Sequence, residues 1–143
     1  MALRVLLVAA AFAAVACGGR RAASPDDGVP PGGAHVVAVT DSLLAAGGCD
    51  TVRFGRLRPG EIAVKRLWVE NRTAHPLLLV SYTRSCGCTT LDYSAEPIAP
   101  AVARPLSLTF DSRGERGWQL KLLELRFAGA GRNLRLVVEA DVD

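Results

Sequence analysis

The chain has 143 residues, half of them hydrophobic, and a formal net charge of +3. This length suits a single domain, since domains commonly run to about 100 to 150 residues. Lys and Arg are scattered along the chain and form no basic stripe of the kind that nucleic-acid binding needs, so we exclude a nucleic-acid partner.

Residues 1–16 have the pattern of a secretory signal peptide. Arg4 precedes an uncharged apolar run from Val5 to Ala16, which is a targeting segment and not part of the fold. The run is shorter than the about 20 residues that a membrane-spanning helix needs, so a retained transmembrane anchor is the weaker interpretation.

The stretch AVAC, residues 14–17, resembles the lipobox of bacterial lipoproteins. The resemblance implies that Cys17 is the lipid-modified first residue of the mature protein, with acyl chains such as palmitate attaching it to a membrane. Gly18 after the cysteine implies sorting to the outer membrane, facing the periplasm. Ala14 stands where the lipobox usually has Leu, and the alternative is an ordinary signal peptide in which Cys17 has no special role.

The region from residue 17 to residue 48 is predicted to be a disordered tether. Residues 18–34 are rich in Gly, Pro, Ser and charged side chains and offer almost nothing to bury. The segment His35–Thr40 is either a first strand or a continuation of the tether. We place the domain boundary at Cys49, so that the folded domain spans residues 49–143.

Downstream of this boundary the apolar residues alternate as they do in β-strands. Ile62–Asn71 and Pro76–Arg84 are predicted strands, joined by a hairpin-like turn at residues 72–75. In Arg104–Phe110, Leu and Phe alternate with Ser and Thr, which predicts a further strand.

The last two predicted strands, residues 118–127 and Leu134–Val142, flank a turn at Gly129–Asn133. The first of them, WQLKLLELRF, also suits a helix, because Leu, Lys, Gln and Glu are good helix formers. The flanking turns and the neighbouring strand of matching length favour a hairpin. Short strands at close spacing predict an all-β protein, a small sandwich or barrel of about seven strands.

Several short motifs occur within these strands and turns in a particular order. They are PGE at 59–61, SCGCTT at 85–90, PIAP at 97–100 and LTFDSRGERG at 108–117. In this order and spacing they resemble the bacterial envelope family known as domain of unknown function 1573, over residues 52–142, with SCGCT as the most specific element. The resemblance implies an immunoglobulin-like β-sandwich, frequent lipoprotein anchoring and no established biochemical activity.

Some motif residues have a structural interpretation. Gly60 and Gly114 are expected to supply a positive backbone φ in turns, and Asn71 is expected to end its strand by bonding to its own turn. Two residues depart from the family pattern: Ala101 stands where the family usually has Gly, so a different turn is expected there, and Cys49 has no usual counterpart.

Cys86 and Cys88 are separated by one residue in the SCGCTT motif. In an oxidising compartment, unpaired cysteines seldom remain free. A disulfide between them closes a very small ring, which Gly87 suits because it can bend the chain, and such a bridge would be easily reduced and fits thiol-redox chemistry. Two other arrangements fit the sequence: the thiols pack at a strand end, or one of them pairs with Cys49.

A metal site is a further alternative for the two thiols. Zinc normally takes three or four protein ligands, and His75, the only histidine in the predicted domain, lies too far along the chain to join them. A soft two-coordinate ion such as Cu(I) needs only Cys86 and Cys88. Copper is therefore the only cofactor that the motif suggests.

The sequence shows no acid and base pair and no phosphate-binding loop, so we do not expect an enzyme. The favoured prediction is a membrane-anchored, non-catalytic binding or assembly module with an envelope protein as its partner, recognised by addition of a strand to an exposed sheet edge. The alternative is copper binding or thiol-redox chemistry at Cys86 and Cys88. Trp68 and Trp118 are candidate contact residues, although a position in the core or at its rim is the favoured prediction for both.

Overall fold

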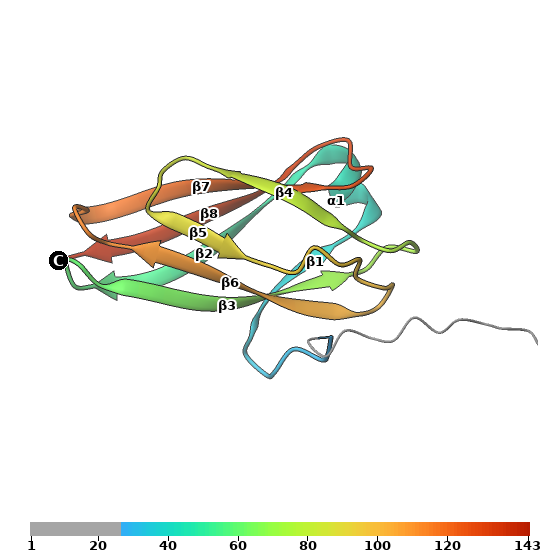
Figure 1. Ribbon diagram of the computed structural model, residues 1–143, viewed down its shortest axis with the longest axis horizontal. Helices are drawn as coiled ribbons and strands as arrows, with labels where there is room; N and C mark the ends of the chain where they lie inside the picture. The colour runs from blue at the N-terminus through green and yellow to red at the C-terminus, as the bar shows by residue number, and fades with distance from the viewer. Residues whose placement is uncertain (1–26) are drawn as a thin grey trace, which may run out of the picture.

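The computed structural model describes residues 27–143, so the predicted signal peptide and Cys17 lie outside the described residues. Within this range the chain forms eight strands and one short helix, arranged as two four-stranded sheets packed face to face (Figure 1). The predicted fold class, an immunoglobulin-like β-sandwich, is confirmed, with eight strands instead of about seven. Among residues 27–143, no helix has the length and apolar character needed to cross a bilayer.

Each sheet contains strands from both halves of the chain. The first sheet has, in spatial order, β1 (His35–Val39), β3 (Ile62–Asn71), β6 (Ala103–Asp111) and β5 (Thr89–Asp92). The second has, in the same way, β2 (Gly48–Leu57), β8 (Leu134–Val142), β7 (Gly117–Phe127) and β4 (Leu79–Arg84). Helix α1 (Asp41–Ala46) leads from β1 in the first sheet to β2 in the second.

The core between the sheets is built from alternate residues of the strands, as predicted. In β8 every second residue from Leu134 to Val142 is buried, and in β6 Leu106, Leu108 and Phe110 are buried in the same way. Burying one large aliphatic or aromatic side chain contributes about 1.5–3 kcal/mol relative to leaving it exposed. The hairpin of β7 and β8 is also confirmed, with antiparallel pairing throughout, and the helical alternative for β7 is wrong.

Asn71 ends β3 at the point where the chain crosses to the other sheet. Its side chain is fully buried, and its Nδ2 donates to the carbonyl oxygens of His75 and Ile98, each at 2.8 Å, while its Oδ1 accepts the N–H of Thr73 at 2.9 Å. The predicted role of Asn71 is confirmed. The predicted hairpin of β3 and β4 is wrong, because the two strands lie in different sheets.

The ordered fold begins before the boundary predicted at Cys49. β1 lies parallel to β3 and contributes Val37 and Val39 to the core. Helix α1 follows, with the Thr40 hydroxyl accepting an N–H of its first turn. The tether predicted for residues 17–48 is therefore wrong in its last part, because the alternating valines of β1 are buried as part of the first sheet.

Residues upstream of β1 are also bound to the domain. The Nε of Arg104 donates to Asp27 Oδ1 at 2.6 Å, and these two side chains are only 5% and 7% exposed. The Gly28 N–H donates to the Ala103 carbonyl at 3.1 Å, and a Cβ built on Gly28 would lie 3.9 Å from the Trp68 ring. Trp68 is buried beneath this segment, so its predicted position in the core or at its rim is confirmed.

Positive backbone φ angles occur at turns that the motifs predicted. Gly60, between β2 and β3, has a φ of 86°, and Gly114, between β6 and β7, has a φ of 79°. Ala101 has a φ of 62° and is the only residue other than glycine with a positive φ in the described range. It therefore holds a left-handed conformation that glycine would adopt without steric cost.

Candidate functional site

The SCGCTT motif forms the corner at which the chain passes from β4 in one sheet to β5 in the other. Cys86 and Cys88 form a disulfide with their Cα atoms 5.3 Å apart, a separation within the usual range for disulfides. Gly87 between them is exposed, and a Cβ built there would touch nothing. We term residues Ser85–Cys88 the disulfide corner.

Cys49 is not the partner of either motif cysteine. It has no disulfide partner within residues 27–143 and is exposed in β2. β2 and β4 are the outermost strands at opposite edges of the second sheet, about 14 Å apart at the usual strand spacing. The candidate pairing with Cys49 is therefore wrong, since Cys86 and Cys88 are bonded to each other.

Hydrogen bonds fix both ends of the disulfide corner. The Ser85 N–H donates to the Leu122 carbonyl of β7 at 2.8 Å, and the Ser85 Oγ accepts the Leu122 N–H at 2.9 Å. At the other end, the Cys88 carbonyl accepts the N–H of Asp111 at 2.8 Å. The corner is thus attached to β7 in one sheet and to β6 in the other.

Arg84 and Thr89 lie on the two sides of the disulfide corner. The Arg84 guanidinium donates to the Thr89 carbonyl at 2.6 Å and to the Thr90 hydroxyl at 3.2 Å, and so connects β4 to β5 across the edge of the sandwich. The Thr89 hydroxyl is buried and has no hydrogen-bond partner within residues 27–143. A buried hydroxyl in this state costs about 1–3 kcal/mol, and no feature of the sequence indicates it.

The disulfide bears directly on the metal alternative. Within residues 27–143, no three His, Cys, Asp or Glu side chains are grouped so that they could hold a metal ion. Cys86 and Cys88 are bonded to each other, and a thiolate is the form of cysteine that binds metal. Copper binding therefore stays a prediction that applies to the reduced protein.

β7 extends beyond the end of its neighbour β4. The pairing of β4 with β7 stops at Leu123, and Ser85 adds its contact with Leu122 before the disulfide corner turns the chain away. On its other side, β7 remains paired with β8 down to its first residue. Residues Gly117–Lys121 therefore have a strand on one side only, and we term them the open edge.

Exposed apolar side chains accompany the open edge on the outer face of the sheet. The exposed fraction is 66% for Trp118, 61% for Leu120 and 36% for Leu122. The core position predicted for Trp118 is wrong, because this residue lies in the part of β7 that β4 does not reach and faces away from the other sheet. A cluster of exposed apolar side chains beside an unpaired strand is typical of an interaction site.

The charged groups around the open edge are mostly paired. Lys121 Nζ lies 3.0 Å from Glu115 Oε2, and Arg113 Nε lies 2.9 Å from Asp111 Oδ2. The side-chain hydrogen bond from Arg113, followed by its backbone N–H, lowers the pKa of Asp111 below its usual 3.8, and the same carboxylate raises the pKa of Arg113. Arg116, in the turn before β7, forms no ion pair within residues 27–143.

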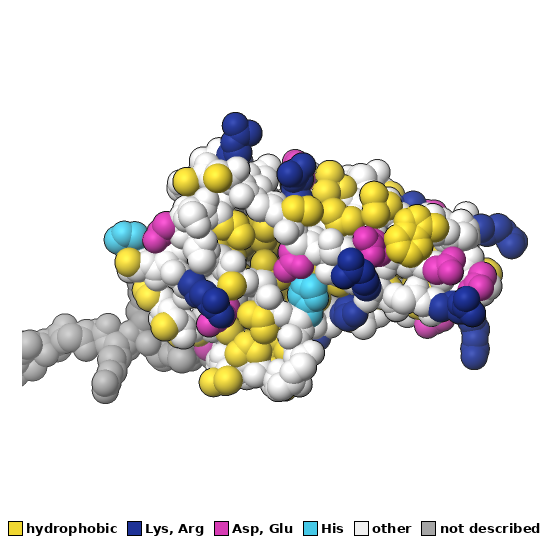
Figure 2. Space-filling view, turned by 180° about the vertical axis from the view of Figure 1, so that it is seen from behind, with side chains coloured by type: hydrophobic (Ala, Val, Ile, Leu, Met, Phe, Trp, Pro, Cys, Tyr) yellow, Lys and Arg dark blue, Asp and Glu magenta, His cyan; other side chains and the backbone are white. Residues whose placement is uncertain are grey.

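Charges of both signs are dispersed over the face that Figure 2 shows. Figure 2 shows one face of the domain, on which Lys and Arg side chains alternate with Asp and Glu side chains and apolar groups. No continuous basic area is seen on this face.

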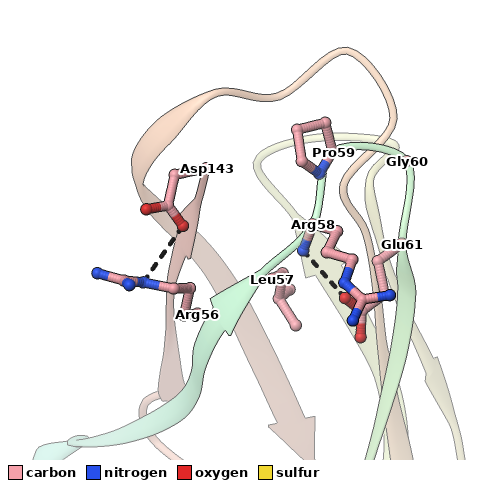
Figure 3. A pocket seen from close by; sticks show the side chains of 7 residues that line it. All are labelled: Arg56, Leu57, Arg58, Pro59, Gly60, Glu61 and Asp143. Carbon is pink, nitrogen blue, oxygen red and sulfur yellow. Dashed lines mark hydrogen bonds and ion pairs between the residues drawn. The ribbon is translucent and has the colours of Figure 1, made fainter.

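A hollow lies between the β2–β3 turn and the last residue of the chain (Figure 3). Two of its polar contacts are internal: Arg56 Nε lies 3.3 Å from Asp143 Oδ1, and the Arg58 N–H donates to Glu61 Oε2 at 3.0 Å. These bonds close the turn and hold the chain end. The hollow therefore has a structural explanation and adds nothing to the candidate site.

Comparison with solved structures shows the fold. A protein of unknown function from Porphyromonas gingivalis W83 matches with a TM-score of 0.55 and 21% identity, over 64% of this chain and 43% of that chain. The secreted serine protease VesC from Vibrio cholerae matches with a TM-score of 0.50 and 12% identity, over 63% of this chain and 21% of that chain. The matched region is thus less than half of each of these proteins. No curated protein matches the sequence.

The family comparison covers the part of the chain that carries both features of the candidate site. The model of the family described as "Protein of unknown function (DUF1573)" matches residues 48–142. This range contains the disulfide corner and the open edge, and it agrees with the resemblance found in the motifs. Since the match spans well over half of the sequence, the chain belongs to the DUF1573 family.

Proposed function

We propose that this protein is a lipoprotein of the bacterial envelope that serves as a non-catalytic binding or assembly module. In this proposal, residues 1–16 are removed as a signal peptide and Cys17 carries the acyl chains that anchor the protein, facing the periplasm, in the outer membrane. The partner is another envelope protein. The sequence of residues 1–17 supports the anchor, and the family supports an envelope setting.

The observation that carries the binding function is the open edge of β7 with its exposed apolar side chains. Natural sheet proteins usually cover or charge an unpaired strand, because it can pair with other chains. Here Trp118 and Leu120 remain exposed beside it. Binding of a partner would remove this apolar surface from water and would require no reactive group.

The anchor and the binding function can be tested in the same cells. Labelling with palmitate and membrane fractionation of the full chain should give a labelled, membrane-bound protein, and the Cys17→Ser variant should lose both the label and the membrane association. Unchanged fractionation of the Cys17→Ser variant would show that the anchor is wrong.

Binding is tested with a photo-crosslinking residue at position 120. It should give one discrete product with an envelope protein, which excess purified domain competes away. The matched control places the crosslinker at Arg135, which is exposed on β8 of the same sheet, and should give no such product. Equal products from both positions would contradict a binding site at β7.

Thiol-redox chemistry at Cys86 and Cys88 is the second candidate, favoured by the disulfide itself. In such a reaction the disulfide would accept two electrons and two protons from a dithiol, leaving two thiols here and a disulfide in the substrate. Incubation with a reduced dithiol peptide should then yield one oxidised peptide for every two thiols gained by the protein. Copper handling would instead require the reduced protein to bind one Cu(I) that a Cys86→Ser/Cys88→Ser variant does not bind.

A further inference from the structure

We infer that the open edge of β7 binds an extended segment of the partner protein, which joins the second sheet as an additional antiparallel strand. The segment has apolar residues at alternate positions and acidic residues at its two ends. This inference rests on the proposed binding function and specifies how the partner is recognised.

The backbone groups of alternate residues in β7 face the β4 side. Both backbone groups of Leu122 face the β4 side, because its N–H and carbonyl bond to Ser85. Backbone groups in a strand alternate in direction from one residue to the next. The N–H and carbonyl of Leu120 and Trp118 therefore face the same side, where β4 is no longer present.

The open edge is limited at both ends. At one end the disulfide corner leaves the sheet after Ser85, held by the Cys86–Cys88 bond. At the other end Gly117 has a φ of 66°, which ends the strand and leads into the turn before it. A segment of about five residues, continuing the line of β4 along β7, fits between these limits.

The bound segment would meet different side chains on its two faces. Residues paired with Trp118 and Leu120 would project on the outer face, beside two side chains that are 66% and 61% exposed. Residues in between would project on the inner side, where Gln119 and the Lys121–Glu115 ion pair are half-buried. On one face of an antiparallel pair, an apolar side chain is stabilised by an apolar neighbour and a polar side chain by a neighbour that can bond to it. Apolar and polar residues must therefore alternate in the segment.

Two arginines lie near the ends of the open edge. Arg84, beside the disulfide corner, bonds to the uncharged oxygens of Thr89 and Thr90. Arg116 lies before the other end of the open edge. Within residues 27–143 neither arginine forms an ion pair, so one unpaired guanidinium lies near each end. Acidic residues flanking the bound segment complement this charge.

The same charges argue against a second copy of this chain as the occupant. Two copies could pair antiparallel through their open edges with Gln119 at the centre of the contact. In this register, Trp118 of one copy lies opposite Leu120 of the other. This pairing would also bring Arg116 of one copy toward Ser85 and Arg84 of the other at both ends. Like charges at both ends of so short a contact oppose the dimer.

The test uses the domain from residue 27 to residue 143 and the acetylated, amidated peptide Glu-Thr-Val-Thr-Val-Thr-Glu. Amide shifts of Trp118 and Leu120 should change in a saturable way as peptide is added. N-methylation of both valines removes the two N–H groups that face β7 and should weaken binding about tenfold or more, since each hydrogen bond contributes about 0.5–1.5 kcal/mol. N-methylation of the first and last threonines, whose N–H groups face away, should change the affinity by less than about threefold.

Two variants of the protein complete the test. Leu120→Pro removes an N–H that the sheet does not use and should weaken peptide binding at least about tenfold, whereas Leu120→Thr keeps that N–H and should lose less. If Leu120→Pro does not fold, Arg84→Glu/Arg116→Glu takes its place: it should weaken binding of this peptide and strengthen binding of a peptide with Lys at both ends.

Three results would overturn the inference. In the first, both methylation patterns weaken peptide binding equally. In the second, Leu120→Pro leaves peptide binding unchanged. In the third, the peptide does not bind and the domain forms a dimer that Leu120→Pro abolishes. If the peptide fails and position 120 still crosslinks to an envelope partner, strand addition is wrong and the binding function stands. If both fail, the proposed function is wrong as well.

Discussion

Ser85 and Leu122 form the last hydrogen-bonded contact between β4 and β7. The Ser85 N–H and Oγ bond to the carbonyl and N–H of Leu122 at 2.8 and 2.9 Å. One of these two bonds uses a side-chain oxygen where a regular strand would use a backbone carbonyl. The contact therefore marks the boundary between the paired part of β7 and the open edge.

Replacing Ser85 with Ala should remove the acceptor for the Leu122 N–H. Because the site is exposed to solvent, water can replace the hydroxyl, and the free energy of unfolding should fall by only about 0.5–1 kcal/mol. Amide hydrogen exchange at Leu122 should become faster. Ser81→Ala in the middle of β4 is the control and should leave this amide unchanged; unaltered exchange in Ser85→Ala would contradict the contact.

The disulfide should contribute modestly to stability. The loop that it closes is very short, and the chain-entropy relation then gives about 1–2 kcal/mol. A Cys86→Ser/Cys88→Ser variant should fold with its core intact and show this loss in urea unfolding. Cys49→Ser, which removes an exposed thiol, should change stability by less than about 0.5 kcal/mol. Failure of the double variant to fold would mean that the corner is essential to the sandwich.

Asn71 should be among the most sensitive polar residues of the domain. Its buried amide satisfies the carbonyl oxygens of His75 and Ile98 and the N–H of Thr73. Asn71→Ala leaves these groups without their partner and should lower the free energy of unfolding by about 3 kcal/mol. The exposed Asn133 is the matched control, and Asn133→Ala should cost less than about 0.5 kcal/mol.

Ala101→Gly should stabilise the protein. The left-handed φ of 62° at Ala101 costs an alanine about 1–2 kcal/mol. Glycine avoids this cost, but its greater chain entropy in the unfolded state opposes folding. The net gain in the free energy of unfolding should be about 0.5–1 kcal/mol. Thermal unfolding measures the difference. Ala99→Gly, an exposed neighbour with no positive φ, should instead be neutral or slightly destabilising.

Asp111 should titrate below its usual pKa of 3.8, because Arg113 donates side-chain and backbone hydrogen bonds to it. Since the folded-state pKa is the lower one, the carboxylate stabilises the fold above pH 3.8, and this contribution is lost as the pH falls through the folded-state pKa. NMR titration of the carboxyl carbon should show the lowered value. Arg113→Gln should raise it, and an unchanged value would contradict the hydrogen bonds.

The strands were predictable where side chains alternate over their full length. β8 and β6 show such alternation, and in both the predicted inward residues are buried. The sequence does not distinguish β1 from a tether, because β1 has only five residues and follows a stretch rich in Gly and Pro. The crossing of the chain between β3 and β4 was missed because a turn sequence does not tell whether the next strand joins the same sheet.

The candidate site was predictable only in part. The SCGCTT motif located Cys86 and Cys88, but several bonding states of the two thiols fit the sequence equally. The exposure of Trp118 depends on where β4 ends relative to β7, which is a relation between residues more than 30 positions apart in the chain. The local sequence pattern carries no information on such a relation. The open edge could therefore be found only from the residue pairing of β4 with β7.

The buried bond between Asp27 and Arg104 has a consequence for how far the domain can move from a bilayer. If Cys17 carries the proposed acyl chains, only the nine residues 18–26 lie between the anchor and Asp27. A chain of this length spans at most about 35 Å. Asp111, which holds the disulfide corner, lies seven residues beyond Arg104 along β6, a further 23 Å or so. The anchor would thus limit how far the domain can move from its own leaflet, and the disulfide corner and the open edge lie toward the end of β6 that is away from the Asp27–Arg104 bond.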